Sequence, residues 1–92
     1  MKPAIISDPA LADLNDLVGW LAERSPKAAE RAAETLFGAI GLLEHQPEMA
    51  PRGDGRFREL PVPFGRSGFI IRYTVTDDAV IIQRVFHGAQ VR

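Results

Sequence analysis

The chain has 92 residues, enough for one domain around a single hydrophobic core and too few for a second domain. Apolar residues make up 46% and charged residues 25%, a balance typical of a globular protein rather than a disordered one. The absence of cysteine excludes a disulfide framework, a thiol nucleophile and any cysteine-based zinc site, and it favours a reducing cytoplasm. The N-terminus has only a very short apolar run, so we expect neither a signal peptide nor a membrane span.

The net charge of −1 conceals an asymmetry between the two halves of the chain. Residues 1–50 carry four basic and eight acidic side chains, whereas residues 51–92 carry seven basic side chains, all arginine, and four acidic ones. Because arginine favours planar contacts to phosphate or carboxylate, we expect the C-terminal half to meet an anionic partner. An ordinary solvated surface accounts for these arginines equally well.

The first elements are predicted from local signals. Residues 3–7 are expected to form a short strand. Asp8 is expected to cap a helix in which Pro9 takes the first position, where a missing N–H does no harm. Apolar residues then recur every three or four positions as far as Arg24, which predicts a helix with one apolar stripe. The stripe consists of Leu11, Leu14, Leu17, Val18 and Leu21.

A second helix is expected immediately afterwards, because Ser25 and Pro26 repeat the signal of a cap followed by proline, and Pro47 ends it. Its apolar face consists of Ala29, Ala32, Ala33, Leu36, Phe37, Ile40 and Leu43. Two helices joined so tightly should form an antiparallel hairpin. Gly38 and Gly41 are each unfavourable in a helix by about 1 kcal/mol relative to alanine, so we expect close helix packing there.

The remainder of the chain reads as strands. A loop rich in proline and glycine occupies residues 45–56. Strand-like patterns follow at residues 57–62, 69–75 and 80–86, with turns at 63–68 and 76–79. We therefore predict an α+β fold with a short N-terminal strand, an antiparallel helical hairpin and a three-stranded antiparallel meander, all in one domain over residues 1–92.

The last hairpin has a predicted register, with Asp77 and Asp78 as its loop residues. One face then pairs Val75 with Val80, Tyr73 with Ile82, Ile71 with Arg84 and Phe69 with Phe86, and it should pack on the helices. The opposite face pairs Ile70 with Val85, Arg72 with Gln83 and Thr74 with Ile81, and His87 lies just beyond. In this register Arg72 and Arg84 lie on opposite faces.

Motifs for cofactors and metals are not found. Neither a P-loop nor a dinucleotide-binding glycine motif occurs. His45 and His87 are far apart and lack partners at ligand spacing, so we expect no metal site and no cofactor. Ser67 lies outside any serine-hydrolase motif and is more simply a turn residue.

One set of residues is compatible with cleavage of RNA through its 2′-hydroxyl group. The set consists of Glu59, Arg72, Arg84 and His87. Such a reaction needs a base, an acid for the leaving oxygen, and cations that stabilise the pentacovalent phosphate. The predicted register, however, separates Arg72 from Arg84. The alternative is structural: Arg72 and Gln83 form a cross-strand polar pair, and His87 caps the end of the sheet.

Several short phrases resemble one protein family. They are Ala-Asp-Leu at 12–14, Trp-Leu-Ala-Glu-Arg-Ser-Pro at 20–26, Arg-Glu-Leu at 58–60, Ile-Arg-Tyr at 71–73 and Arg-Val-Phe-His-Gly-Ala at 84–89. In this order, and with the predicted elements, the chain resembles over essentially its whole length the RelE/ParE superfamily of toxins from bacterial type II toxin–antitoxin systems.

The resemblance favours one branch of that superfamily. Members similar to RelE cleave mRNA on the ribosome and place a basic residue after a glycine-aromatic pair, whereas here Ile70 follows Gly68 and Phe69. Those ribonucleases also use a tyrosine or histidine in a longer basic C-terminal segment. This chain has no tyrosine after Tyr73, although His87 could partly substitute. The pattern is closer to ParE, whose members poison DNA gyrase.

The resemblance to ParE implies inhibition of gyrase by binding, without bond-making chemistry, a block of replication, and a role in plasmid stabilisation. The candidates for target contact are Arg58, Arg72, Arg84 and His87. The resemblance also implies a cytoplasmic complex with a cognate antitoxin, whose C-terminal segment binds as a helix in a groove and as an added strand on a sheet edge. Contact with DNA would occur only through the antitoxin, and no membrane is involved.

Two alternatives stay open. The first is a ribosome-dependent mRNA endonuclease that uses Glu59, Arg72, Arg84 and His87. The second is a non-toxic module that has kept the fold and its antitoxin but has lost its target.

Overall fold

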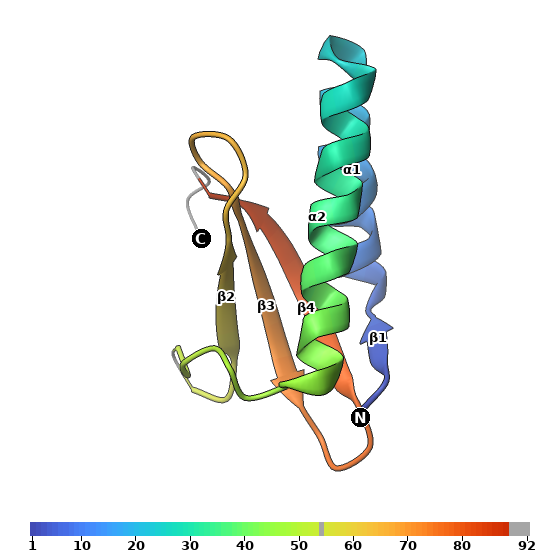
Figure 1. Cartoon of the computed structure of the whole chain (residues 1–92). Coiled ribbons are helices and arrows are strands. Elements are labelled where there is room, and N and C mark those ends of the chain that lie inside the picture. Colours follow the sequence, from blue (N-terminus) through green and yellow to red (C-terminus); the bar gives the residue numbers. More distant parts are fainter. Residues whose placement is uncertain (54, 89–92) are drawn as a thin grey trace.

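A helical hairpin lies against one face of a four-stranded sheet in the computed structural model, which describes residues 1–53 and 55–88 (Figure 1). The elements in chain order are β1 (Ala4–Ile6), α1 (Asp8–Arg24), α2 (Pro26–His45), β2 (Arg58–Val62), β3 (Phe69–Val75) and β4 (Val80–His87). The strand order is β1-β4-β3-β2, in which β1 runs parallel to β4 and the other pairs are antiparallel. The predicted α+β fold is confirmed, and β1 adds a parallel strand to the predicted meander.

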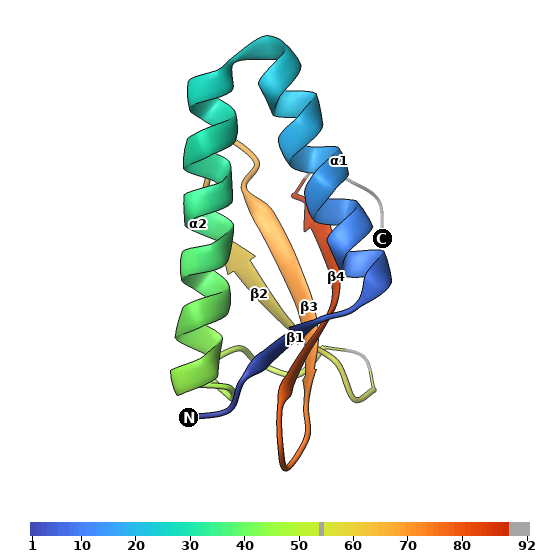
Figure 2. The same ribbon diagram turned by 90° about the vertical axis from the view of Figure 1, so that its right-hand side faces the viewer.

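The helix starts follow from serine caps. The prediction of Asp8 as the first cap is wrong by one residue, because the Ser7 hydroxyl accepts the hydrogen bond from the Ala10 N–H at 3.2 Å. Asp8 instead lies in the first turn, where a negative charge interacts favourably with the helix dipole. The second cap is confirmed, since the Ser25 hydroxyl accepts from the Ala28 N–H at 3.2 Å. The two helices run antiparallel, and their joined end extends beyond the strands (Figures 1 and 2).

The core lies between the hairpin and the sheet. Its fully buried large side chains are Tyr73, Leu36, Leu43, Ile71, Ile82, Val80 and Val85. Two residues of the predicted apolar helix faces are exposed to solvent, Leu11 at 47% and Phe37 at 52%. The expected close packing at Gly38 and Gly41 is also wrong, because a Cβ atom added at either position would meet no atom within 4 Å. Neither described helix is long and apolar enough to cross a membrane.

The predicted register of the last hairpin is right near its turn and wrong beyond it. The structure pairs Val75 with Val80, Thr74 with Ile81 and Tyr73 with Ile82, as expected. The register then shifts between Arg72 and Tyr73, and the further pairs are Arg72 with Arg84, Ile71 with Val85, Ile70 with Phe86 and Phe69 with His87. Gln83 is the extra residue of this β-bulge.

The bulge reverses the predicted face of every residue from 84 to 87, including the two candidate site residues Arg84 and His87. Residues directly opposite each other in an antiparallel pair share a face of the sheet. Arg84 therefore lies on the same face as Arg72, and this face has no described helix upon it. His87 lies opposite buried Phe69 and so belongs to the face that the helices cover, contrary to the prediction.

Candidate functional site

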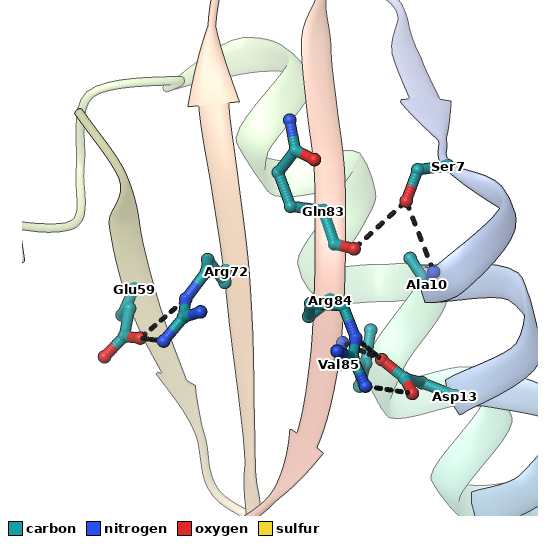
Figure 3. A network of polar contacts seen from close by, with 8 residues as sticks. All are labelled: Ser7, Ala10, Asp13, Glu59, Arg72, Gln83, Arg84 and Val85. Carbon is teal, nitrogen blue, oxygen red and sulfur yellow. Dashed lines mark hydrogen bonds and ion pairs between the residues drawn. The ribbon is translucent and has the colours of Figure 1, made fainter. Parts of the chain in front are cut away.

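Arg72 is held on the helix-free face of the sheet by a carboxylate from the neighbouring strand. Its Nε and one terminal nitrogen donate to the same oxygen of Glu59, at 3.0 and 2.9 Å (Figure 3). The strand register explains this contact, because Glu59 on β2 lies directly opposite Arg72 on β3. The expected cross-strand pair of Arg72 and Gln83 is wrong, since the Gln83 amide instead donates to the Thr74 hydroxyl at 3.2 Å. Arg72 therefore already has a carboxylate partner within the chain.

Arg84 is paired with α1. Its Nε and one terminal nitrogen donate to the two carboxylate oxygens of Asp13, at 2.8 and 3.0 Å, and the Val85 N–H donates to Asp13 at 2.9 Å (Figure 3). Burial by itself would raise the pKa of Asp13, but the hydrogen bonds from Arg84 and Val85 outweigh it and lower the pKa below its usual value. The hydrogen bond to Asp13 raises the pKa of Arg84. This cluster joins α1 to the outer edge of β4 beyond the end of β1.

Aromatic rings and guanidinium groups alternate across the helix-free face. The guanidinium carbon of Arg84 lies 5.3 Å from the centroid of the Phe86 ring, and that of Arg72 lies 5.1 Å from the same ring. Arg72 is also 5.5 Å from the centroid of Phe57. Phe86 is consequently only 8% exposed although no described helix covers it. We call Asp13, Arg84, Phe86, Arg72 and Glu59 the sheet ladder.

Arg58 lies away from the sheet ladder. It sits opposite buried Tyr73, on the face that the helices cover. One terminal nitrogen donates to the Ala50 carbonyl at 2.6 Å, and the other lies 3.9 Å from the Glu48 carboxylate. The Tyr73 hydroxyl accepts from the Ala50 N–H at 3.4 Å, and burial raises the pKa of Tyr73. Arg58 therefore anchors the loop after α2 onto the sheet.

His87 is separated from Arg72 and Arg84 by the sheet itself. Its ring meets the Phe69 ring edge to face, with centroids 6.3 Å apart. It also lines two depressions beside α1. Of the candidate residues for RNA cleavage, the structure brings together Glu59, Arg72 and Arg84 on the helix-free face and places His87 on the other.

The two depressions form a groove that the residue patterns did not predict. One of about 320 Å³ is lined by Asp13, Asp16, Leu17, Trp20, Val85 and His87. The other, of about 240 Å³, is lined by Leu17, Trp20, Leu21, Phe64, Gly65, Arg66, Ser67, Phe69 and His87. They share Leu17, Trp20 and His87, and we call them together the Trp20 groove. The available signal was the helical spacing of Asp13, Asp16 and Trp20, which places them on one flank of α1 beside its apolar stripe.

Comparison with known proteins identifies the family. The model of the ParE toxin of type II toxin–antitoxin systems, parDE, matches residues 4–92. The chain belongs to this ParE toxin family. Toxin RelE1 and Toxin RelE3 of Caulobacter vibrioides are each 35% identical to it, over 88 and 92 residues. These matches cover 96% and 100% of this chain and 95% and 100% of those toxins.

A solved structure has the same fold as this ParE-family toxin. The chromosomal ParDE system from P. aeruginosa superimposes with a TM-score of 0.77 at 20% identity, over 95% of this chain and 96% of that one. At this identity the match supports the fold alone. Membership of the ParE toxin family makes the chain a toxin of a type II toxin–antitoxin system, and such a system implies an antitoxin partner. The names of its relatives divide between RelE and ParE, so they do not specify the target.

Proposed function

We propose that this ParE-family toxin inhibits DNA gyrase by binding to it in the cytoplasm, makes or breaks no bond itself, and thereby blocks replication. The observation that carries the proposal is the separation of the candidate catalytic residues. His87 lies on the helix-covered face of the sheet, whereas Glu59, Arg72 and Arg84 lie on the other. An acid or base on one side of a sheet cannot act on a phosphate held by cations on the other side.

The state of the arginines gives further support. Arg72 and Arg84 each donate two hydrogen bonds to a carboxylate of the same chain. To stabilise a transferring phosphate, each would have to exchange that carboxylate for the substrate, at the cost of breaking a charge-assisted pair. Ile70 adds no charge at the position where ribonucleases of the superfamily carry a basic residue.

The experiment that tests the proposal separates the two targets directly. Purified toxin is added to gyrase with relaxed plasmid, and in parallel to ribosomes translating a defined mRNA. We expect supercoiling to stop and the mRNA to stay intact. Cleaved mRNA with unimpaired supercoiling would refute gyrase inhibition and favour the endonuclease.

The endonuclease is kept as the second candidate because three curated relatives, Toxin RelE1, RelE3 and RelE2, bear the RelE name. His87→Ala tests it, since an endonuclease that relies on this histidine would lose mRNA cleavage. His45→Ala provides the matched control, because His45 is exposed at the end of α2.

Neutralisation by a cognate antitoxin is the second half of the proposal, and a strand added at β2 is the expected contact. The opposite edge of the sheet is already occupied near its start, where the Ala4 N–H donates to the Glu44 carboxylate at 2.8 Å and the Lys2 N–H to the Glu44 carbonyl at 3.1 Å. Among the described residues, the bridge between Arg52 and Arg58 pairs with the outer side of β2 at its first residue. We therefore propose β2 as the edge at which the antitoxin adds its strand.

A further inference from the structure

The Trp20 groove offers a partly apolar hollow that can hold a partner side chain. Figures 1 and 2 show that the joined end of the helices extends past the strands, so the last turn of α1 and the first turn of α2 face no strand. Leu17, Leu21 and Phe64 line the space left beneath this overhang, and each is only partly buried. Concave apolar surface of this kind marks sites of interaction.

The Trp20 side chain lies at the rim of this groove and is ordered by contacts with Arg24. Trp20 is 53% exposed and lines both depressions. The guanidinium carbon of Arg24 lies 3.8 Å from the centroid of its ring, and Arg24 also donates to the Trp20 carbonyl at 3.0 Å. A tryptophan fixed in this way loses little conformational entropy on binding, and tryptophan is among the residues that dominate interface energies.

The charges around the groove indicate the chemistry of the occupant. Asp13 and Asp16 lie at one end and Arg66 at the other. Asp13 is already paired with Arg84, so the exposed carboxylate of Asp16 gives this end its negative charge, which disfavours the phosphates of a nucleic acid. A protein surface that presents an apolar side chain beside a cationic one satisfies both the apolar wall and the acidic end.

We infer that the Trp20 groove is the surface through which this toxin binds its protein target, by taking up an apolar side chain that has a lysine or arginine next to it. This inference rests on the proposed function, in which the target is gyrase, and it assigns the contact to the enzyme's protein surface rather than to its DNA. It moves the target contact from the arginines of the sheet ladder to α1 and the loop between β2 and β3.

Trp20→Ala tests the inference, with Phe37→Ala as its matched control. Phe37 is also an aromatic residue on a helix, is 52% exposed, and lines neither depression. We expect Trp20→Ala to raise the concentration for half-maximal inhibition of supercoiling by about 30-fold, the size of an interface hot spot. Phe37→Ala should stay within about threefold of the unchanged toxin, and both variants should keep its circular dichroism spectrum and melting temperature.

A second pair of variants tests the charge argument. Asp16→Lys reverses an exposed charge of the groove, and Asp77→Lys makes the same change of net charge at the distant hairpin turn. Only Asp16→Lys should weaken inhibition, and it should also weaken binding to gyrase in the absence of DNA. If the two variants changed inhibition equally, the inference that the partner presents a lysine or arginine would be overturned.

The remaining outcomes separate the inference from the proposed function. Unchanged inhibition by Trp20→Ala would overturn the inference, and a loss confined to antitoxin affinity would identify the groove as the antitoxin's seat instead. If the unchanged toxin does not inhibit gyrase, the proposed function fails. Growth arrest by the same variants then decides the inference: selective loss in Trp20→Ala supports the groove as the target surface, and equal arrest by both overturns it.

Discussion

Replacing Asp13 by alanine removes three hydrogen bonds that join α1 to β4. The Val85 N–H loses its acceptor, and Val85 is only 2% exposed. An unsatisfied buried N–H costs about 1–3 kcal/mol. The contacts to Arg84 add a smaller amount, because the side chain of Arg84 is 46% exposed and is solvated after the change. We expect the free energy of unfolding to fall by about 2–3 kcal/mol, which lowers the melting temperature of a domain of this size by roughly 10–20 °C.

Asp13→Asn separates the hydrogen bonds from the charge. The asparagine carbonyl can still accept from the Val85 N–H, so we expect a loss of only about 1 kcal/mol. The pKa of Asp13 is lowered in the folded state, so its contribution is complete above the unfolded pKa and is lost as the pH falls through the folded pKa. The stability difference between the unchanged protein and Asp13→Asn should therefore shrink between pH 7 and pH 3, as measured by urea unfolding.

Arg84→Ala provides the decisive comparison. If the Val85 N–H is the main group that Asp13 satisfies, Arg84→Ala destabilises the protein less than Asp13→Ala does, because the carboxylate can still accept from Val85. Equal losses in the two variants would refute this reasoning and assign the stability to the ion pair. A difference between the unchanged protein and Asp13→Asn that stayed constant down to pH 3 would refute the assigned charge effect.

Three further predictions concern other features. Gly38→Ala and Gly41→Ala should each raise the free energy of unfolding by about 1 kcal/mol in denaturant titrations, because no atom obstructs the added methyl group; a loss would show that the space is not available. Gly68→Ala should lower the melting temperature far more than Gly65→Ala. Both glycines have a positive φ, but only at Gly68 would the new Cβ collide with backbone atoms. Similar melting temperatures of the two variants would contradict this. Arg72→Gln should lower the free energy of unfolding by about 1.5 kcal/mol yet leave gyrase inhibition by the folded toxin within about threefold; a selective loss of inhibition would restore Arg72 as a target contact.

The elements could be predicted from sequence because their signals are local. Ser25 followed by Pro26 sets the tight helical turn, and Asp77 with Asp78 sets the hairpin. The first cap was misplaced because Ser7 and Asp8 are both good N-caps, and the choice depends on tertiary contacts: the Ser7 hydroxyl also donates to the Gln83 carbonyl at 3.0 Å.

The β-bulge could not be predicted from the alternation of apolar and polar residues alone, because its prediction requires knowing which residues are buried. Ile82 is fully buried and Val85 is 2% exposed, yet they are three residues apart. In an uninterrupted strand, residues at this spacing point to opposite faces. An extra residue at Gln83 allows both to face the core and leaves Gln83 and Arg84 on the helix-free side. The pair of adjacent polar residues between two apolar ones was the available signal.

The sequence shows the excess of arginine in the C-terminal half, but it does not show which groups these arginines contact. Arg58, Arg72 and Arg84 are bound to carbonyl or carboxylate groups of the same chain. Their partners follow no common spacing, since Ala50 lies 8 residues from Arg58, Glu59 lies 13 from Arg72 and Asp13 lies 71 from Arg84. No pattern along the chain could therefore assign these pairs, and the Trp20 groove likewise depends on how far the helices overhang the strands.

The sheet ladder explains how one face of the sheet can do without a layer of helices. Phe86 would present its ring to water there, but Arg72 and Arg84 cover it, and Glu59 and Asp13 neutralise them. The charged groups of this face already have partners within the chain, so a protein that docked on it would have to separate these ion pairs before it gained contacts. The Trp20 groove has no such cost at its apolar wall, since water alone must leave. Recognition by packing under the helical overhang is therefore favoured over recognition by the arginines of the sheet.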